Sequence, residues 1–135
     1  MIQPISFSKV IEHEKLSERL MALRAVVAAA RTEAPNGIAS PMLCAVAGQL
    51  LRDLYRLISR EPDARALPRL DPRQPPELRE LSAMLRDAQL ALDAFAYAHR
   101  DHDDEYGDEW LTVEGIEAFH ERPERSYPPS GPAAR

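Results

Sequence analysis

The chain has 135 residues, of which 44% are apolar and only 6% aromatic, and its formal net charge is −5 at pH 7. This length suits one domain with a modest core, and the lone Cys44 excludes a framework of internal disulfides. The first ten residues, MIQPISFSKV, lack the basic and apolar regions of a signal peptide, and no apolar run is long enough to cross a bilayer. We therefore expect a cytoplasmic protein, and the excess of arginine over lysine suggests a bacterial source.

The first predicted helix covers residues 9–33, with Ser8 as its N-cap. Apolar residues recur there in alternating steps of four and three, which is the spacing of one helix face. These positions are Leu16, Leu20, Leu23, Val27, Ala30 and Ala34. The helix should end before Pro35, because the residue that precedes a proline is pushed out of the helical region and Asn36-Gly37 favours a turn.

A second helix should begin at Pro41, with Ser40 as its N-cap, because proline at the first helical position loses no hydrogen bond. Its apolar face carries Leu43, Ala47, Leu50, Leu54 and Leu57, and its polar face carries Gln49, Arg52, Asp53, Arg56 and Arg60. Two such amphipathic helices joined by a short turn predict an αα-hairpin.

Repeated prolines between residues 61 and 76 predict an extended strap without a helix. Leu67 and Leu70 are the residues expected to attach this strap to the core. About 14 residues of extended chain reach about 43 Å, which exceeds the length of a 20-residue helix of about 30 Å. The third helix can therefore run parallel or antiparallel to the second, and the sequence leaves the choice open.

The third helix is predicted over residues 76–100 and carries two apolar lines. One line has core spacing and comprises Leu78, Leu81, Leu85, Ala88, Leu92 and Phe95. The other repeats every seven residues at Ala83, Leu90 and Tyr97 on a different face. Either this helix is the central one of the bundle, or its second face contacts another protein chain.

An acidic loop should follow, and then a short fourth helix with Thr112 as its N-cap. We expect Trp110, Val113, Ile116 and Phe119 to bury against the bundle. The tail over residues 121–135 is rich in proline and small polar residues, which predicts disorder. The fold class is thus all-α: a small helical bundle that forms a single domain over residues 1–120, followed by the tail.

The stretch HRDHDDEYGDEW, which begins at His99, invites a metal-binding interpretation. An EF-hand loop needs a glycine at its bend and a closing glutamate, and no register supplies both here. A transition-metal site could use His99, Asp101, His102 and Asp103, since His99 and Asp103 would share a face if the third helix continued. The alternative, which we favour, is that His99 caps the C-terminal end of that helix.

No signature of an enzyme is evident. The chain has no glycine-rich phosphate loop, no G-x-S-x-G and no C-x-x-C, and Cys44 is expected to be a small buried hydrophobe. Whether the protein is an enzyme is not decided by this, but we favour a non-enzymatic role and expect no cofactor.

Three hypotheses follow. The first is a protein-interaction module, self-associating or part of a larger bacterial or phage assembly, in which Ala83, Leu90, Tyr97 and Trp110 bind the partner and the acidic C-terminal arm steers docking. The second is a protein that binds a divalent metal through the cluster at residues 99–105. The third is an anion or nucleic-acid binder that uses Arg52, Arg56 and Arg60, although the net acidic charge makes nucleic acid the weaker candidate.

Overall fold

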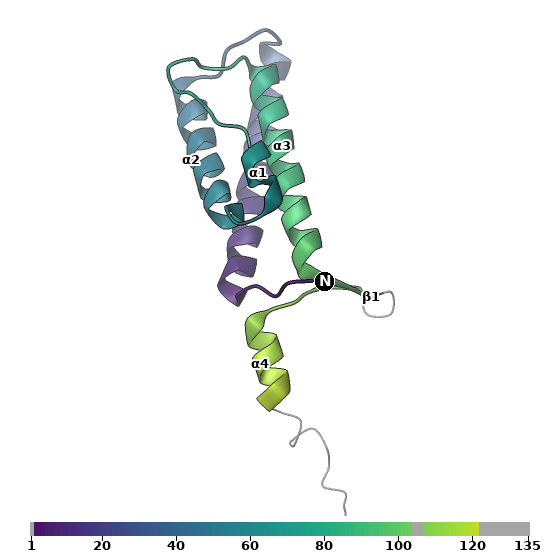
Figure 1. Ribbon diagram of the computed structural model, residues 1–135. Helices are drawn as coiled ribbons and strands as arrows, with labels where there is room; N and C mark the ends of the chain where they lie inside the picture. Colours follow the sequence, from purple (N-terminus) through teal and green to yellow (C-terminus); the bar gives the residue numbers. More distant parts are fainter. Residues whose placement is uncertain (1, 104–106, 122–135) are drawn as a thin grey trace, which may run out of the picture. The chain divides into compact units, whose positions relative to one another are not determined.

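The protein is a small all-α helical bundle with one short two-stranded sheet, as shown by a computed structural model that describes residues 2–103 and 107–121 (Figure 1). The fold class predicted from the sequence is therefore confirmed. The described residues form two compact units, one made of residues 11–98 and the other of residues 2–10, 99–103 and 107–121. A single domain over residues 1–120 stays a prediction, and the tail predicted to be disordered lies, after Glu121, outside the described residues.

Helix α1 spans Phe7–Glu33, close to the predicted range. One face of it is buried, at Val10, His13, Leu16, Leu20, Leu23 and Val27. Leu20 and Val27 are completely covered, so the predicted core spacing is confirmed over the centre of the helix. Ala34 lies beyond the helix end and is exposed, because the chain turns at Pro35 and Asn36.

Helix α2 spans Pro41–Ile58 and begins as predicted: the Ser40 hydroxyl accepts a hydrogen bond from the Leu43 amide at 3.2 Å. This bond satisfies one of the amides that a helix start leaves without a partner. The buried face of α2 includes Ala47, Leu50 and Leu54, which pack with almost no exposure. Cys44 is also buried, as predicted, and its thiol lies 3.8 Å from the Ala39 carbonyl oxygen.

The strap that follows α2 contains a short 3-10 helix, η1, at Pro62–Ala66, so the prediction of no helix in this segment is wrong over five residues. Proline at the first helical position supports such a turn, as it does in α2. Leu67 is buried and Leu70 is half-buried, which agrees with their predicted attachment to the core.

The strap crosses the bundle and makes α3, which spans Leu78–His99, run parallel to α2 (Figure 1). Two hydrogen bonds of 2.9 Å place the two helix starts together, from the Ala39 amide to the Pro76 carbonyl and from the Leu78 amide to the Gly37 carbonyl. Helix α1 runs antiparallel to both. The orientation that the sequence left open is thus the parallel one.

The buried face of α3 is the predicted one and comprises Leu78, Leu81, Leu85, Ala88, Leu92 and Phe95. Four of these side chains have no exposed surface at all. Among the described residues, none of the helices has the length and hydropathy needed to cross a membrane.

The second unit holds an antiparallel hairpin where the sequence predicted an acidic loop. Strand β1 spans Arg100–Asp103 and pairs with β2, Gly107–Trp110, so the loop prediction is wrong for these residues. Aspartate and glycine are poor strand formers, and only the tertiary pairing reveals this hairpin.

Helix α4 spans Val113–Glu121, and Thr112 caps it as predicted by accepting a 3.0 Å hydrogen bond from the Gly115 amide. The N-terminal segment pairs beside this cap: the Ile5 amide donates to the Leu111 carbonyl, and the Val113 amide donates to the Ile5 carbonyl. Ile116 is half-buried, but Val113 and Phe119 are exposed, Phe119 to 74%, so their expected burial is wrong.

Candidate functional site

The second apolar line of α3 lies on the surface of the 11–98 unit. Leu90 is 61% exposed and Tyr97 is 71% exposed, whereas Ala83 is half-buried. Asp87 and Ala94 continue the same line, in steps of four and three, between these positions. We call Ala83, Asp87, Leu90, Ala94 and Tyr97 the α3 contact face. Both large side chains are mostly exposed, so α3 is not enclosed as a central helix would be.

A shallow groove runs along the α3 contact face. It has a volume of about 490 Å³, and Leu90 and Ala94 line it together with Ala91, Asp87, Ala66 and Leu67. Ala66 is the last residue of η1 and Leu67 follows it in the strap, so the strap forms one wall of the groove and α3 forms the other. Alanines at its floor allow another backbone to approach closely.

Trp110 was predicted to join this contact surface, but it belongs to the other unit. It is half-buried and pairs across the hairpin with Arg100, whose guanidinium lies 4.6 Å from the indole ring centroid. This is a cation–π contact, which favours a cation over the indole face. Trp110 therefore stabilises its own hairpin, and its part in partner binding stays a prediction.

The residues proposed as metal ligands do not lie on one helix face. Helix α3 ends at His99, so the condition under which His99 and Asp103 would share a helix face is not met. Asp101 and His102 are exposed neighbours in β1, and successive strand residues point to opposite sides. The side chain of Asp103 lies outside the described residues. Among those that are described, no group of three or more histidine, cysteine or acidic side chains is arranged to hold a metal ion.

His99 has a structural partner instead. It is only 4% exposed, and its Nδ1 lies 2.6 Å from the Gln3 carbonyl oxygen. The His99 carbonyl in turn accepts a hydrogen bond of 2.9 Å from the Leu111 amide. Through these two bonds the last residue of α3 joins the N-terminal segment to the segment that leads into α4.

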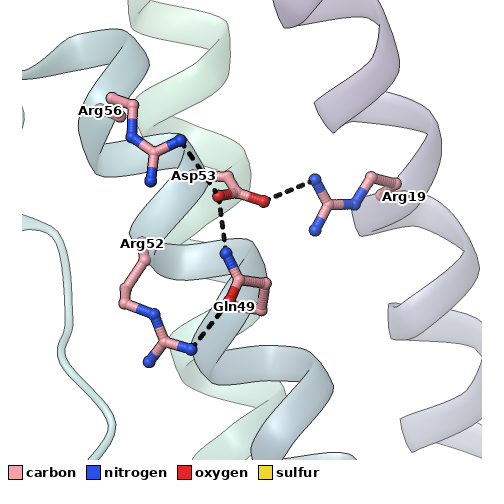
Figure 2. A network of polar contacts seen from close by, with 5 residues as sticks. All are labelled: Arg19, Gln49, Arg52, Asp53 and Arg56. Carbon is pink, nitrogen blue, oxygen red and sulfur yellow. Dashed lines mark hydrogen bonds and ion pairs between the residues drawn. The ribbon is translucent and has the colours of Figure 1, made fainter.

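The arginines of α2 form a polar network centred on Asp53 (Figure 2). Asp53 accepts hydrogen bonds from Arg19 of α1 at 2.9 Å and from Gln49 at 2.8 Å, and Arg56 lies 3.8 Å away. Arg52 donates to the Gln49 side chain at 3.0 Å. The third predicted member, Arg60, lies in the turn after α2 and does not extend the row along the helix.

The pKa of Asp53 reflects this network. Burial by itself raises the pKa of the carboxyl group, because it disfavours the charged form. The hydrogen bonds from Arg19 and Gln49, together with the positive charges of Arg19 and Arg56, outweigh burial and hold the pKa below its ordinary value. Asp53 is therefore ionised at neutral pH and orders the basic side chains around it.

Comparisons with known proteins give no relative: no family model matches the chain, and no curated protein or solved structure matches it significantly. The geometry above is therefore the only basis for a function.

Proposed function

We propose that this protein is a non-enzymatic interaction module that associates with a second copy of itself through the α3 contact face. The supporting observation is the exposure of Leu90 and Tyr97, two large side chains that lie seven residues apart on a helix whose other face is fully buried. Large apolar side chains that share one exposed helix face are typical of protein–protein contact sites. Tyrosine is also enriched in such interfaces.

The groove beside the α3 contact face suits a helix as its occupant. A helix that packs there would insert its own large side chains between Leu90 and the strap, over Ala91 and Ala94. Steps of three and four along the contact face are those that a left-handed pair of helices requires.

A second copy of α3 fits because the contact face is complementary to itself. In an antiparallel pair, Leu90 of each copy lies over Ala94 of the other, so a large side chain meets a small one. In the same register Tyr97 lies opposite Asp87 of the other copy, because both pairs of positions add up to the same number. In a two-fold dimer every contact occurs twice, so each favourable contact contributes twice to the free energy of association.

The test is the mass of the protein in solution, measured by analytical ultracentrifugation over a range of concentrations. The wild-type chain should sediment at twice its mass of 15.2 kDa. The double variant Leu90→Asp, Tyr97→Asp should be a monomer with unchanged helical circular dichroism, because it places two charges in the apolar contact.

The matched control is Met21→Asp with Met42→Asp. These methionines are 72% and 77% exposed on α1 and α2, so the variant adds the same charge to equally exposed apolar positions. It should remain a dimer. A monomeric wild type at high concentration, or equal disruption by both double variants, contradicts the proposal.

A further inference from the structure

A second hollow of the 11–98 unit lies between α2 and the strap, and we call it the arginine cleft. Its volume is about 610 Å³, which is in the range of sites for small organic ligands of about 300–1,000 Å³. The helix contributes Gly48, Leu51, Arg52, Tyr55, Arg56 and Ser59, and the strap contributes Leu67, Pro68, Arg69 and Leu70. Gly48 lets Arg52 and Leu70 lie close to the helix backbone: a Cβ at this position would be 3.5 Å from Arg52 Nη1 and 3.7 Å from Leu70 Cδ2.

The charge of the arginine cleft is positive although the protein as a whole is acidic. Three guanidinium groups line it, from Arg52 and Arg56 on α2 and from Arg69 on the strap, and none of its lining residues that the structure describes is a carboxylate. Two of these arginines are held in place by a neighbour. Arg52 bonds to Gln49, and Arg69 lies 5.7 Å from the ring centroid of Tyr55.

Asp53 is the nearest carboxylate in sequence, and it neutralises this group only in part. Its Oδ2 is bound by Arg19 at 2.9 Å, on the side of α2 that faces α1, and its Oδ1 accepts from Gln49 (Figure 2). Arg56 is 3.8 Å from the same carboxylate, at the outer limit of an ion pair, and its side chain is 77% exposed. Arg52 and Arg56 therefore keep donors for a ligand, because a guanidinium has five of them.

The remaining walls are apolar. Leu51 and Leu67 are buried beneath the cleft, Leu70 is half-buried beside it, and the Tyr55 ring is 41% exposed. A bare inorganic anion would leave this surface in contact with water, whereas a flat apolar body would cover it. A guanidinium can also bind an anion in bidentate geometry and stack on an aromatic ring.

We propose that the arginine cleft binds a small organic anion, in which a phosphate, sulfonate or carboxylate group is attached to a flat apolar body. The anionic group is held by Arg52, Arg56 and Arg69, and the apolar body lies against Tyr55, Leu67 and Leu70. The cleft shares Leu67 with the groove beside the α3 contact face, but none of the five residues of that face lines it, and ligand binding does not require self-association.

The experiment compares three probes by two-dimensional NMR and calorimetry on the full-length chain. Phenyl phosphate carries both features, inorganic phosphate carries only the charge, and phenol carries only the ring. Phenyl phosphate should shift the amides of residues 48–59 and 67–70 and bind at least about tenfold more tightly than either partial probe, since charge and apolar contact each contribute. Equal binding of phenol or of inorganic phosphate, or shifts confined to other residues, would overturn the proposal.

Two variants test the assigned residues. Arg69→Gln and Arg52→Gln should each weaken phenyl phosphate binding by about tenfold, as expected for the loss of one charge-assisted contact. Arg31→Gln removes an exposed arginine that does not line the cleft, and it should bind as the wild type does. Because the side chains of Arg31, Arg52 and Arg69 are all exposed, each of the three variants should keep the wild-type melting temperature. If Arg31→Gln weakens binding as much as Arg69→Gln, the effect is one of net charge and no such site exists.

Discussion

Arg19 and Asp53 join α1 to α2 by an ion pair in which Nη1 lies 2.9 Å from Oδ2. The two residues are 34 positions apart in the sequence, so this bond connects two different helices and is not a contact within one helix. The Asp53 side chain is only 22% exposed and accepts a second bond from Gln49, which fixes its orientation. The pair therefore adds a polar contact to the apolar packing of α1 against α2.

The Asp53 carboxylate should make the stability of the protein depend on pH. Its pKa is lower in the folded state than in the unfolded state, so its contribution is complete above the ordinary aspartate pKa and is lost as the pH falls through the folded value. The free energy of unfolding of Asp53→Asn should be lower than that of the wild type by about 0.2–1 kcal/mol at pH 7. This difference, measured by urea titration, should shrink toward zero in acid. The matched control Glu18→Gln, at an exposed carboxylate of α1, should show no such trend.

Two glycines should respond to alanine with opposite signs. A Cβ at Gly37 would lie 3.0 Å from both the Cβ and the carbonyl oxygen of Ala34, and 3.2 Å from a methyl of Leu78. The backbone there is held by the Leu78 amide, so Gly37→Ala should lower the free energy of unfolding by about 1–3 kcal/mol through overpacking.

Gly48 lies inside α2, where a Cβ would make only ordinary contacts of 3.5 Å or more. Alanine is the better helix former by about 0.5–1 kcal/mol, so Gly48→Ala should stabilise the protein by that amount. Thermal unfolding of Gly37→Ala and Gly48→Ala, compared with the wild type, measures the two changes in stability. If Gly37→Ala also stabilises the protein, the fit at Gly37 is looser than the structure indicates.

Helix boundaries and core faces were predictable because their signals are local. Ser40-Pro41 marks the start of α2 on its own, and the three-four spacing identifies the buried sides of α1 and α3. The second apolar line with Leu90 and Tyr97 was visible in the same way, but the sequence left open whether it is buried in a central helix or contacts another chain, and the structure shows both side chains exposed.

The features that were missed depend on contacts between distant residues. The hairpin at Arg100–Asp103 and Gly107–Trp110 consists of poor strand formers, and the parallel direction of α3 rests on two backbone bonds across the strap. The arginine cleft was missed in part, because Arg69 reaches Tyr55 only after the strap folds back over α2. No pattern within one segment predicts such a pair.

His13 should prove to be a core residue whose ring contributes to stability. It is 7% exposed on α1, its Nε2 lies 3.1 Å from the Leu92 carbonyl oxygen, and its ring stacks on Phe95 at a centroid distance of 5.9 Å. His13→Ala removes the bond and leaves a cavity, so the free energy of unfolding should fall by about 2–4 kcal/mol. His13→Phe keeps the stacked ring but loses the hydrogen bond, so its free energy of unfolding should be only about 1–2 kcal/mol below that of the wild type.

Chemical denaturation of wild type, His13→Phe and His13→Ala should therefore give stabilities in that descending order. Lys15→Ala is the control for a loss of side chain at an exposed position of the same helix, and it should lie within about 0.5 kcal/mol of the wild type. If His13→Phe is as unstable as His13→Ala, the hydrogen bond to Leu92 dominates, and stacking on Phe95 adds little to the packing of α1 against α3.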